Sequence, residues 1–411
     1  MKKISEIPTF RAFRSTDYTL YLTGRAISQF GTIMQQTAVV WLIYTLTHSE
    51  FITGVAAFAE LFPAFLFSIL GGIAADRYSR YKIVNITQIT SMIQAILLAV
   101  LILSHHYVVW EMLVLSVMLG IINAFDVPAR QSMIHDVVHD EADLPSGISL
   151  SASTASLATL LGPALAGIII ESFGAGICFL INAASFGGVI LALAFMKQPK
   201  NSKPRNTNKK VFTDLAEGFI YIRRTPSIGL IILMVGITGL FVMPFSKTLL
   251  PVFAKVVFNG NAKTFGNITS FIGAGSFLGT IVIASLKKNA SLRKVLLGFS
   301  IIMGISLICF SEIRVFPIAM IIAVFIGFGT VAQFTTSNII VQSESLPRMR
   351  GRAISILLMA MNGTVPLGSL IVGAVAEKIG APNTTLFEGI LGLIIAMLFY
   401  YLMKRRKRMK G

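Results

Sequence analysis

Several ionisable side chains lie inside long apolar runs of the sequence, and three of them stand out: Arg25, Glu60 and Glu388. A charge in hydrocarbon costs about 2.5–3.5 kcal/mol on insertion scales, so such a residue usually has a task. A buried carboxyl can take up and release a proton, which makes Glu60 and Glu388 candidates for proton coupling, and Arg25 joins them as a cation that could pair with Glu60. Two other roles fit Glu60 equally well: a packing anchor, or one member of a static ion pair with Arg25. For Arg25, a structural role in the first apolar helix is equally good.

Other chemistry is poorly supported by the residue pattern. His135 and His139 stand one helical turn apart and could share a metal ion, but they follow a polar stretch, and we predict no metal site. The two cysteines, Cys178 and Cys309, each lie inside an apolar run, which predicts small core residues. We find no phosphate-binding glycine loop and no cofactor motif, so we do not expect an enzyme.

The composition requires lipid as a solvent. Of 411 residues, 55% are hydrophobic and 13% are charged, whereas soluble domains carry about 25% charged residues. The net charge of +17 comes from Lys and Arg that cluster in the gaps between apolar runs, so we do not expect a nucleic-acid partner. Such a chain is typical of a multi-pass membrane protein, with the bilayer itself as a partner.

Apolar runs long enough to span a bilayer predict twelve helices. Nearly all of the 35 Lys and Arg residues fall at the termini and in alternate gaps, which places both termini in the cytoplasm. The predicted spans are residues 18–45, 51–74, 83–103, 108–126, 144–170, 174–196, 227–252, 265–286, 293–312, 316–342, 352–376 and 382–403.

A polar stretch divides the chain in two. Residues 197–225 begin with a Pro-, Asn- and Lys-rich linker and end in a predicted amphipathic helix on the membrane surface. Gly167, Glu171 and Gly174 recur 206 residues later as Gly373, Glu377 and Gly380, and a second match keeps the same offset. We therefore predict two pseudo-symmetric six-helix bundles, residues 1–196 and 226–411, in an all-α membrane protein.

The segment after the second span could form a breakable latch between conformations. Its glycines let helices approach, Asp76 could lie at a helix N-terminus, and basic residues hold the cytoplasmic face. The latch residues are Gly72, Asp76, Arg77, Arg80 and Lys82. They resemble the signature loop of the major facilitator superfamily, although Ser79 and Tyr81 depart from its usual pattern.

Further segments are similar to the enterobactin-exporter and macrolide-efflux type of facilitator. They are residues 24–28, 41–44, 123–131, 161–167, 250–254 and 350–352. Within them Gly162, Pro163 and Gly167 match the antiporter motif of the fifth helix, which favours export over uptake. Ordinary helix packing by small residues is the alternative interpretation.

The resemblance implies a central cavity between the two bundles, lined by helices one, four, seven and ten. A mostly apolar pocket with a few hydrogen-bonding groups suits a bulky small molecule. The candidate cavity residues are Gln29, Gln36, Asn123, Phe241, Phe245, Phe334 and Asn362. Hydrogen bonds between helices are the alternative role for each polar member.

These observations lead to one expected function and two alternatives. We expect a secondary active transporter that exports an amphipathic siderophore, drug or macrolide by alternating access and proton antiport, without a cofactor. A monomer is compatible with this fold. One alternative is a facilitator for nutrient uptake or lysolipid flipping on the same fold. The other is a membrane enzyme or scaffold, for which only the stretch around His135 offers suitable residues.

Overall fold

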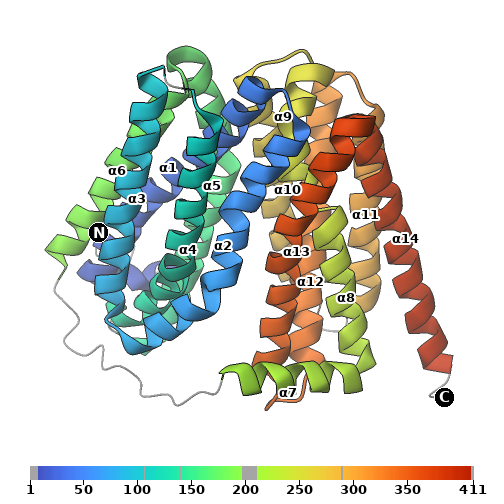
Figure 1. Ribbon diagram of the computed structural model, residues 1–411. Coiled ribbons are helices and arrows are strands. Elements are labelled where there is room, and N and C mark those ends of the chain that lie inside the picture. The colour runs from blue at the N-terminus through green and yellow to red at the C-terminus, as the bar shows by residue number, and fades with distance from the viewer. Residues whose placement is uncertain (1–7, 106, 139, 197–210, 288–289, 409–411) are drawn as a thin grey trace. The chain divides into compact units, whose positions relative to one another are not determined.

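The computed structural model describes residues 8–105, 107–138, 140–196, 211–287 and 290–408, and all the regular secondary structure in them is helical (Figure 1). Eleven helices in this part of the chain are long and apolar enough to cross a membrane. The helix over Thr16–Thr47 is not among them, because polar residues interrupt its 32 residues. The predicted all-helical membrane fold is confirmed.

The chain forms two compact units, residues 1–46 with 59–207 and residues 47–58 with 208–411. The helices of the first half are η2 (Pro8–Arg14), α1 (Thr16–Thr47), α2 (Glu50–Arg77), α3 (Arg80–Leu103), α4 (Val109–Val137), η3 (Glu141–Asp143), α5 (Leu144–Phe173) and α6 (Ala175–Phe195). The continuous helix α2 therefore contributes its first turns to the second unit and the rest to the first unit.

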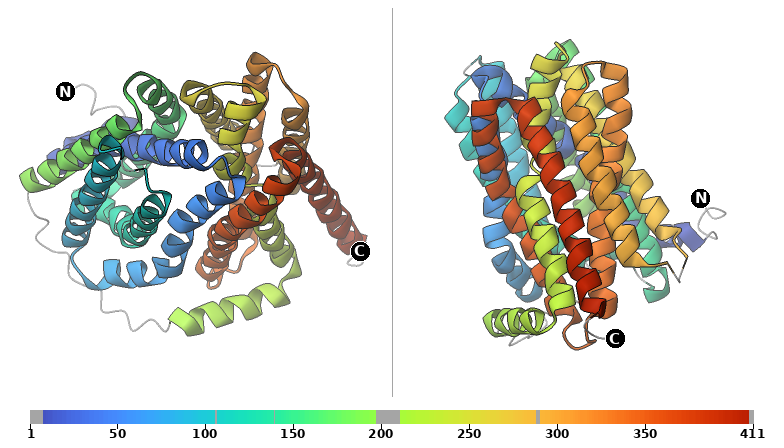
Figure 2. Two further views of the ribbon diagram at one scale, coloured as in Figure 1. Left: turned by 45° about the horizontal axis from the view of Figure 1, so that its top comes forward. Right: turned by 90° about the vertical axis from the view of Figure 1, so that its right-hand side faces the viewer.

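The second half begins with a short amphipathic helix and continues with long apolar ones. Its helices are α7 (Val211–Arg224), α8 (Pro226–Phe241), η4 (Phe245–Leu249), α9 (Leu250–Val252), η5 (Phe253–Val257), α10 (Ala262–Ala284), α11 (Leu292–Glu312), α12 (Phe316–Glu344), α13 (Arg350–Ile379) and α14 (Ala381–Arg408). The predicted surface helix is thus present as α7, which lies across the ends of α8 and α13 (Figure 2). Residues 197–210 of the predicted linker lie outside the described residues.

Helix α4 corrects one predicted boundary. The sequence predicts its end at Asp126, before Pro128, but the helix continues to Val137. A proline inside a helix deprives the carbonyl four residues earlier of its hydrogen bond, here that of Ala124. Gly71 of α2 packs against this carbonyl so closely that an added Cβ would lie 1.8 Å from the Ala124 oxygen. A backbone contact at the freed carbonyl lets the helix tolerate its proline.

The predicted span over residues 227–252 is also irregular. It begins as α8, becomes a π-helix in η4, and is π-helical again in η5. Pro244 and Pro251 remove two backbone donors from this stretch, and a wider turn is one way to accommodate them. The irregular segment holds Phe245 and Phe253 against Phe310 of α11, with ring centroids 5.3 and 5.0 Å from Phe310.

Candidate functional site

Glu60 is paired with an amide rather than with a cation. The Gln36 side chain on α1 donates a hydrogen bond from Nε2 to Glu60 Oε1 on α2, at 2.6 Å, and both side chains are half-buried. Arg25, the predicted partner, is eleven residues from Gln36 on the same helix, which corresponds to about 16 Å along the axis. Glu60 forms no ion pair with the described residues, so a proton exchanged there would change the local charge.

Arg25 instead lies in a cluster of polar residues within the first unit. Asp126 of α4 is buried and accepts hydrogen bonds from Thr87 at 2.7 Å and Gln88 at 3.1 Å, both on α3. Its other carboxylate oxygen lies 2.5 Å from Nε of Arg130, one turn further along α4. The Arg25 guanidinium reaches the Tyr21 hydroxyl at 3.5 Å and forms no ion pair in the described part of the chain. Asp126 thus lies in the interior of the first unit, where it links two residues of α3 to Arg130 of α4.

Glu388 on α14 is the most deeply enclosed carboxyl of the candidates. Its side chain is 4% exposed, and neither oxygen has a hydrogen-bond partner among the described residues. The hydroxyl of Thr385, one turn earlier, is buried and unpartnered as well. Helix α14 packs against α11 and α8 and touches the π-helix η4, so these polar atoms face the interior of the second unit.

The predicted cavity residues divide between the two units, and one of them is not a cavity residue. Gln29, Gln36, Asn123, Phe241 and Phe334 are half-buried, and Asn362 is exposed. Phe245 is 1% exposed and packs edge to face against Phe253 and Phe310, so it is a core residue of the second unit. It was chosen as an aromatic residue of a helix that the resemblance places at the cavity, but its ring packs against Phe253 and Phe310 instead.

Sequence reasoning missed a chain of buried amides in the first unit. Asn182 of α6 donates to Gln35 of α1 at 2.8 Å, and Gln35 donates to Gln94 of α3 at 2.9 Å. Gln94 in turn donates to the carbonyl of Leu115 on α4 at 3.1 Å. Hydrogen bonds of this kind hold transmembrane helices together, and four helices are joined here. The only sequence signal was the presence of amides in apolar runs, which does not reveal their partners.

The predicted latch residues differ in their surroundings. Gly71, not Gly72, makes the close helix contact, because a Cβ on Gly72 would meet nothing within 4 Å. Arg80 pairs with Asp136 of α4 at 2.8 Å and also donates to the Ser132 carbonyl. Asp76 has no hydrogen bond or ion pair within the described residues, and Arg77 and Lys82 are exposed. Arg80 is therefore the member of this motif that joins two helices of the first unit.

The helix-five motif mediates close packing. A Cβ on Gly162 would lie 2.7 Å from a methyl carbon of Ile33 on α1, so glycine is needed for this contact. Pro163 and Gly167 are buried in the same helix. Close helix packing therefore accounts for the residues of this motif, and these contacts do not indicate the direction of transport.

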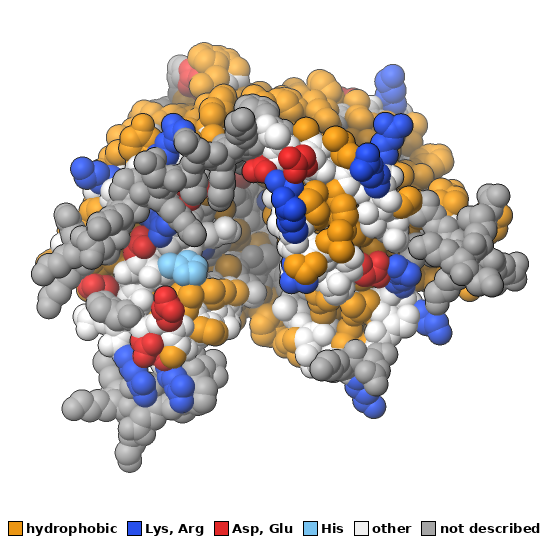
Figure 3. All heavy atoms as spheres, turned by 90° about the horizontal axis from the view of Figure 1, so that it is seen from below, with side chains coloured by type: hydrophobic (Ala, Val, Ile, Leu, Met, Phe, Trp, Pro, Cys, Tyr) orange, Lys and Arg blue, Asp and Glu red, His pale blue; other side chains and the backbone are white. Residues whose placement is uncertain are grey.

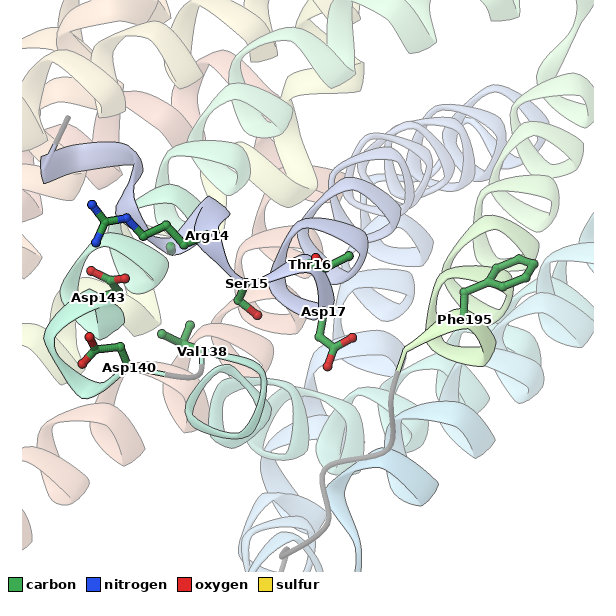
Figure 4. Close-up of a pocket in the computed structure, with 9 residues that line it drawn as sticks. Arg14, Ser15, Thr16, Asp17, Val138, Asp140, Asp143 and Phe195 are labelled. Carbon is green, nitrogen blue, oxygen red and sulfur yellow. The ribbon is translucent and has the colours of Figure 1, made fainter. Parts of the chain in front are cut away.

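One cavity of the first unit lies where η2, the start of α1 and the α4–α5 connection meet (Figure 4). It measures about 420 Å³ and carries the carboxylates of Asp17, Asp140 and Asp143 together with Arg14. Figure 3 shows a face on which Lys and Arg side chains lie beside Asp and Glu. His139, one of the two histidines considered for a metal, lies outside the described residues.

Comparisons with known proteins agree with this fold. The profile of a family described as transmembrane secretion effectors matches residues 7–410. The chain is 27% identical to the staphyloferrin A transporter of Staphylococcus aureus, over 96% of each chain, and 23% identical to the multidrug efflux pump Tap of Mycolicibacterium fortuitum, over 89% of this chain and 91% of Tap. A solved bacterial homolog of the human lysosomal transporter Spinster superposes with a TM-score of 0.74, at 14% identity, covering 95% of this chain and 97% of the other.

The described part of the chain is a set of long apolar helices, and the relatives that match over nearly the whole chain are membrane transporters. The chain belongs to the transmembrane secretion effector family of the major facilitator superfamily. It is a multi-pass membrane protein, and its family is one of transporters rather than enzymes.

Proposed function

We propose that this protein is a secondary active exporter of a small amphipathic molecule, a siderophore or a drug such as a macrolide, coupled to proton entry. The relatives named above transport a siderophore and drugs, and the match extends over nearly the whole chain. The distribution of Lys and Arg places both termini and α7 in the cytoplasm under this proposal. One chain is sufficient for the alternating-access cycle.

The observation that carries the coupling proposal is the hydrogen bond between Gln36 and Glu60. It brings a carboxylate and a neutral amide together from two helices, and no Lys or Arg of the described ranges forms an ion pair with Glu60. Protonation of Glu60 would therefore remove a full charge from the apolar bundle. The neutral side chain would favour a different packing of the helices around it. A proton that moves down a membrane potential of 100 mV releases about 2.3 kcal/mol, and this energy is available for export.

Transport by purified protein in proteoliposomes tests this proposal. Vesicles with an imposed proton gradient are loaded with a carboxylate siderophore or a macrolide, and substrate flux and internal pH are followed together. Wild-type protein should move substrate and protons in opposite directions. Glu60→Gln should keep binding but lose the dependence of flux on the gradient, whereas Glu171→Gln, which alters an exposed carboxylate, should behave as wild type.

Two results would overturn the proposal. Flux that ignores both the proton gradient and the Glu60 substitution would remove proton coupling. Flux only in the inward direction, or transfer of a lysolipid between leaflets without either substrate class, would replace export by the facilitator function that the sequence also allows.

A further inference from the structure

The first unit contains a small recess between two arginines. Arg25 of α1 and Arg130 of α4 both line it, and the remaining lining residues are Tyr21, Ser28, Val84, Gln88 and Val189. Its volume is about 10 Å³, so the recess admits one small occupant. The two valines make part of the wall apolar, so the polar groups converge from a limited set of directions.

The charges around this recess do not cancel. Asp126 is the carboxylate that contacts the cluster, and its oxygens are already engaged by Thr87, Gln88 and Arg130. Two guanidinium groups therefore face one carboxylate, and their positive charges act on one another. Both arginines are half-buried, and two positive charges that share one carboxylate favour an added negative charge.

Hydrogen-bond donors in the recess are also in excess. Arg25 carries five N–H donors, and its one hydrogen bond in the described structure is the 3.5 Å contact with Tyr21. The Tyr21 hydroxyl donates to the Arg130 carbonyl at 3.3 Å, which leaves its lone pair for Arg25. Ser28 is buried and makes no other hydrogen bond with a described residue, so its hydroxyl is available as a donor. An arginine keeps its proton in proteins, so Arg25 is better suited to hold an anion than to carry a proton.

We propose that this recess binds one small monovalent anion, either free chloride or a single carboxylate group, between the guanidinium groups of Arg25 and Arg130. The apolar wall and the small volume exclude sulfate and larger anions. The excess of positive charge excludes cations. The anion would neutralise the cluster and tie α1 to α4 in the same bundle, independently of whether the protein exports the proposed substrates.

Thermal unfolding of the full-length protein in detergent tests the proposal directly. Sodium chloride and sodium formate are titrated against sodium gluconate at constant ionic strength, because gluconate is too large for the recess. Chloride, formate or both should raise the unfolding temperature with saturation. Arg25→Gln should weaken the apparent affinity at least tenfold, and Arg80→Gln, which breaks the Asp136 ion pair elsewhere in the same unit, should leave it unchanged.

The outcomes separate the two sources of the anion. Saturation by both salts supports a general small-anion site, and saturation by formate alone supports a site for a carboxylate as small as formate. If Arg25→Gln does not fold, Tyr21→Phe provides the test, because it removes the hydroxyl that positions Arg25 and should weaken saturation severalfold. Equal responses in gluconate, or saturation that survives both substitutions, would overturn the proposal and leave the recess to water.

Discussion

The carboxylate of Glu377, in the last turn of α13, accepts a hydrogen bond from the hydroxyl of Ser49 at 2.9 Å. The same oxygen accepts the backbone N–H of Phe51 at 3.1 Å, so Glu377 caps the start of α2 from another helix. The backbones approach closely here, since a Cβ on Gly54 would lie 2.3 Å from the Ser369 oxygen. This cap and this contact explain why residues 47–58 of α2 belong to the second unit.

Removal of this cap should loosen the first turns of α2. Glu377→Ala deprives the Phe51 N–H of its acceptor, and lost helix caps cost about 0.5–2 kcal/mol, with exposed sites at the low end. Glu377→Gln should retain part of the effect, because an amide oxygen still accepts but carries no charge. Hydrogen exchange of a peptide that covers residues 49–54 should accelerate in the order wild type, Gln, Ala.

The repeat supplies the control for the cap experiment. Glu171 occupies the corresponding position in the first half and is exposed, so Glu171→Ala should leave exchange in the same peptide unchanged. Unaltered exchange in Glu377→Ala would show that the glycine contact alone holds α2 in place.

Neighbouring glycines in α2 should respond oppositely to the same substitution. Gly71→Ala places a methyl group against the Ala124 carbonyl, where the backbone must move, and overpacking of this kind costs about 1–3 kcal/mol. Gly72→Ala meets open space and gains helix propensity, worth up to about 1 kcal/mol. Thermal unfolding in one detergent should rank Gly72→Ala at or above wild type and Gly71→Ala clearly below it; equal values would refute the α2–α4 contact.

Replacement of the enclosed carboxyl on α14 should stabilise the fold. Both oxygens of Glu388 lack partners among the described residues, and a buried polar group without a hydrogen bond costs about 1–3 kcal/mol in proteins. Glu388→Leu should therefore raise the unfolding temperature, and the near-isosteric Thr385→Val should do so to a smaller extent.

Flux measurements show whether Glu388, which should destabilise the fold, also takes part in transport. If Glu388 takes part in proton coupling, Glu388→Leu should be more stable and yet lose gradient-driven flux, whereas Thr385→Val should keep it. A fall in the unfolding temperature of Glu388→Leu would instead indicate a partner that satisfies the carboxyl, such as an internal water molecule.

Arg352 should anchor the amphipathic helix α7. Its guanidinium bridges Asp214 and Glu217, both at 2.5 Å, from the first turn of α13. Arg352→Gln should accelerate hydrogen exchange in α7, and high salt should reduce the difference from wild type because exposed ion pairs are screened. Arg350→Gln, two residues away and exposed, is the matched control; if both variants behave alike, apolar packing of α7 is what holds it.

Local patterns in the sequence were enough to predict most of the helices. Long apolar runs, with Lys and Arg between them, can satisfy their backbone only as helices in lipid, so the spans and α7 were predicted. Pro128 misled the prediction of the end of α4, because a proline lowers helix stability only when no neighbour accommodates the freed carbonyl. Phe245 was chosen only as an aromatic residue of a helix expected at the cavity, and its burial against Phe253 and Phe310 depends on tertiary packing.

The identity of each polar partner was beyond the reach of the sequence. Helical periodicity shows which residues share a face, but it does not show which helix that face meets. Gln36 and not Arg25 lies beside Glu60, and Gln35 rather than Gln36 joins the amide chain to Asn182. A shift of one residue along a helix turns a side chain by about 100°, so adjacent glutamines face different neighbours.

By itself the sequence determined the class of protein, because hydrophobicity and the placement of positive charge act locally and need no knowledge of neighbours. Tertiary structure alone decided the contacts in which Arg25, Glu60, Glu377 and Glu388 take part. Such contacts form where helices that are far apart in the chain cross. Whether a buried polar group is paired depends on which side chain the neighbouring helix places beside it.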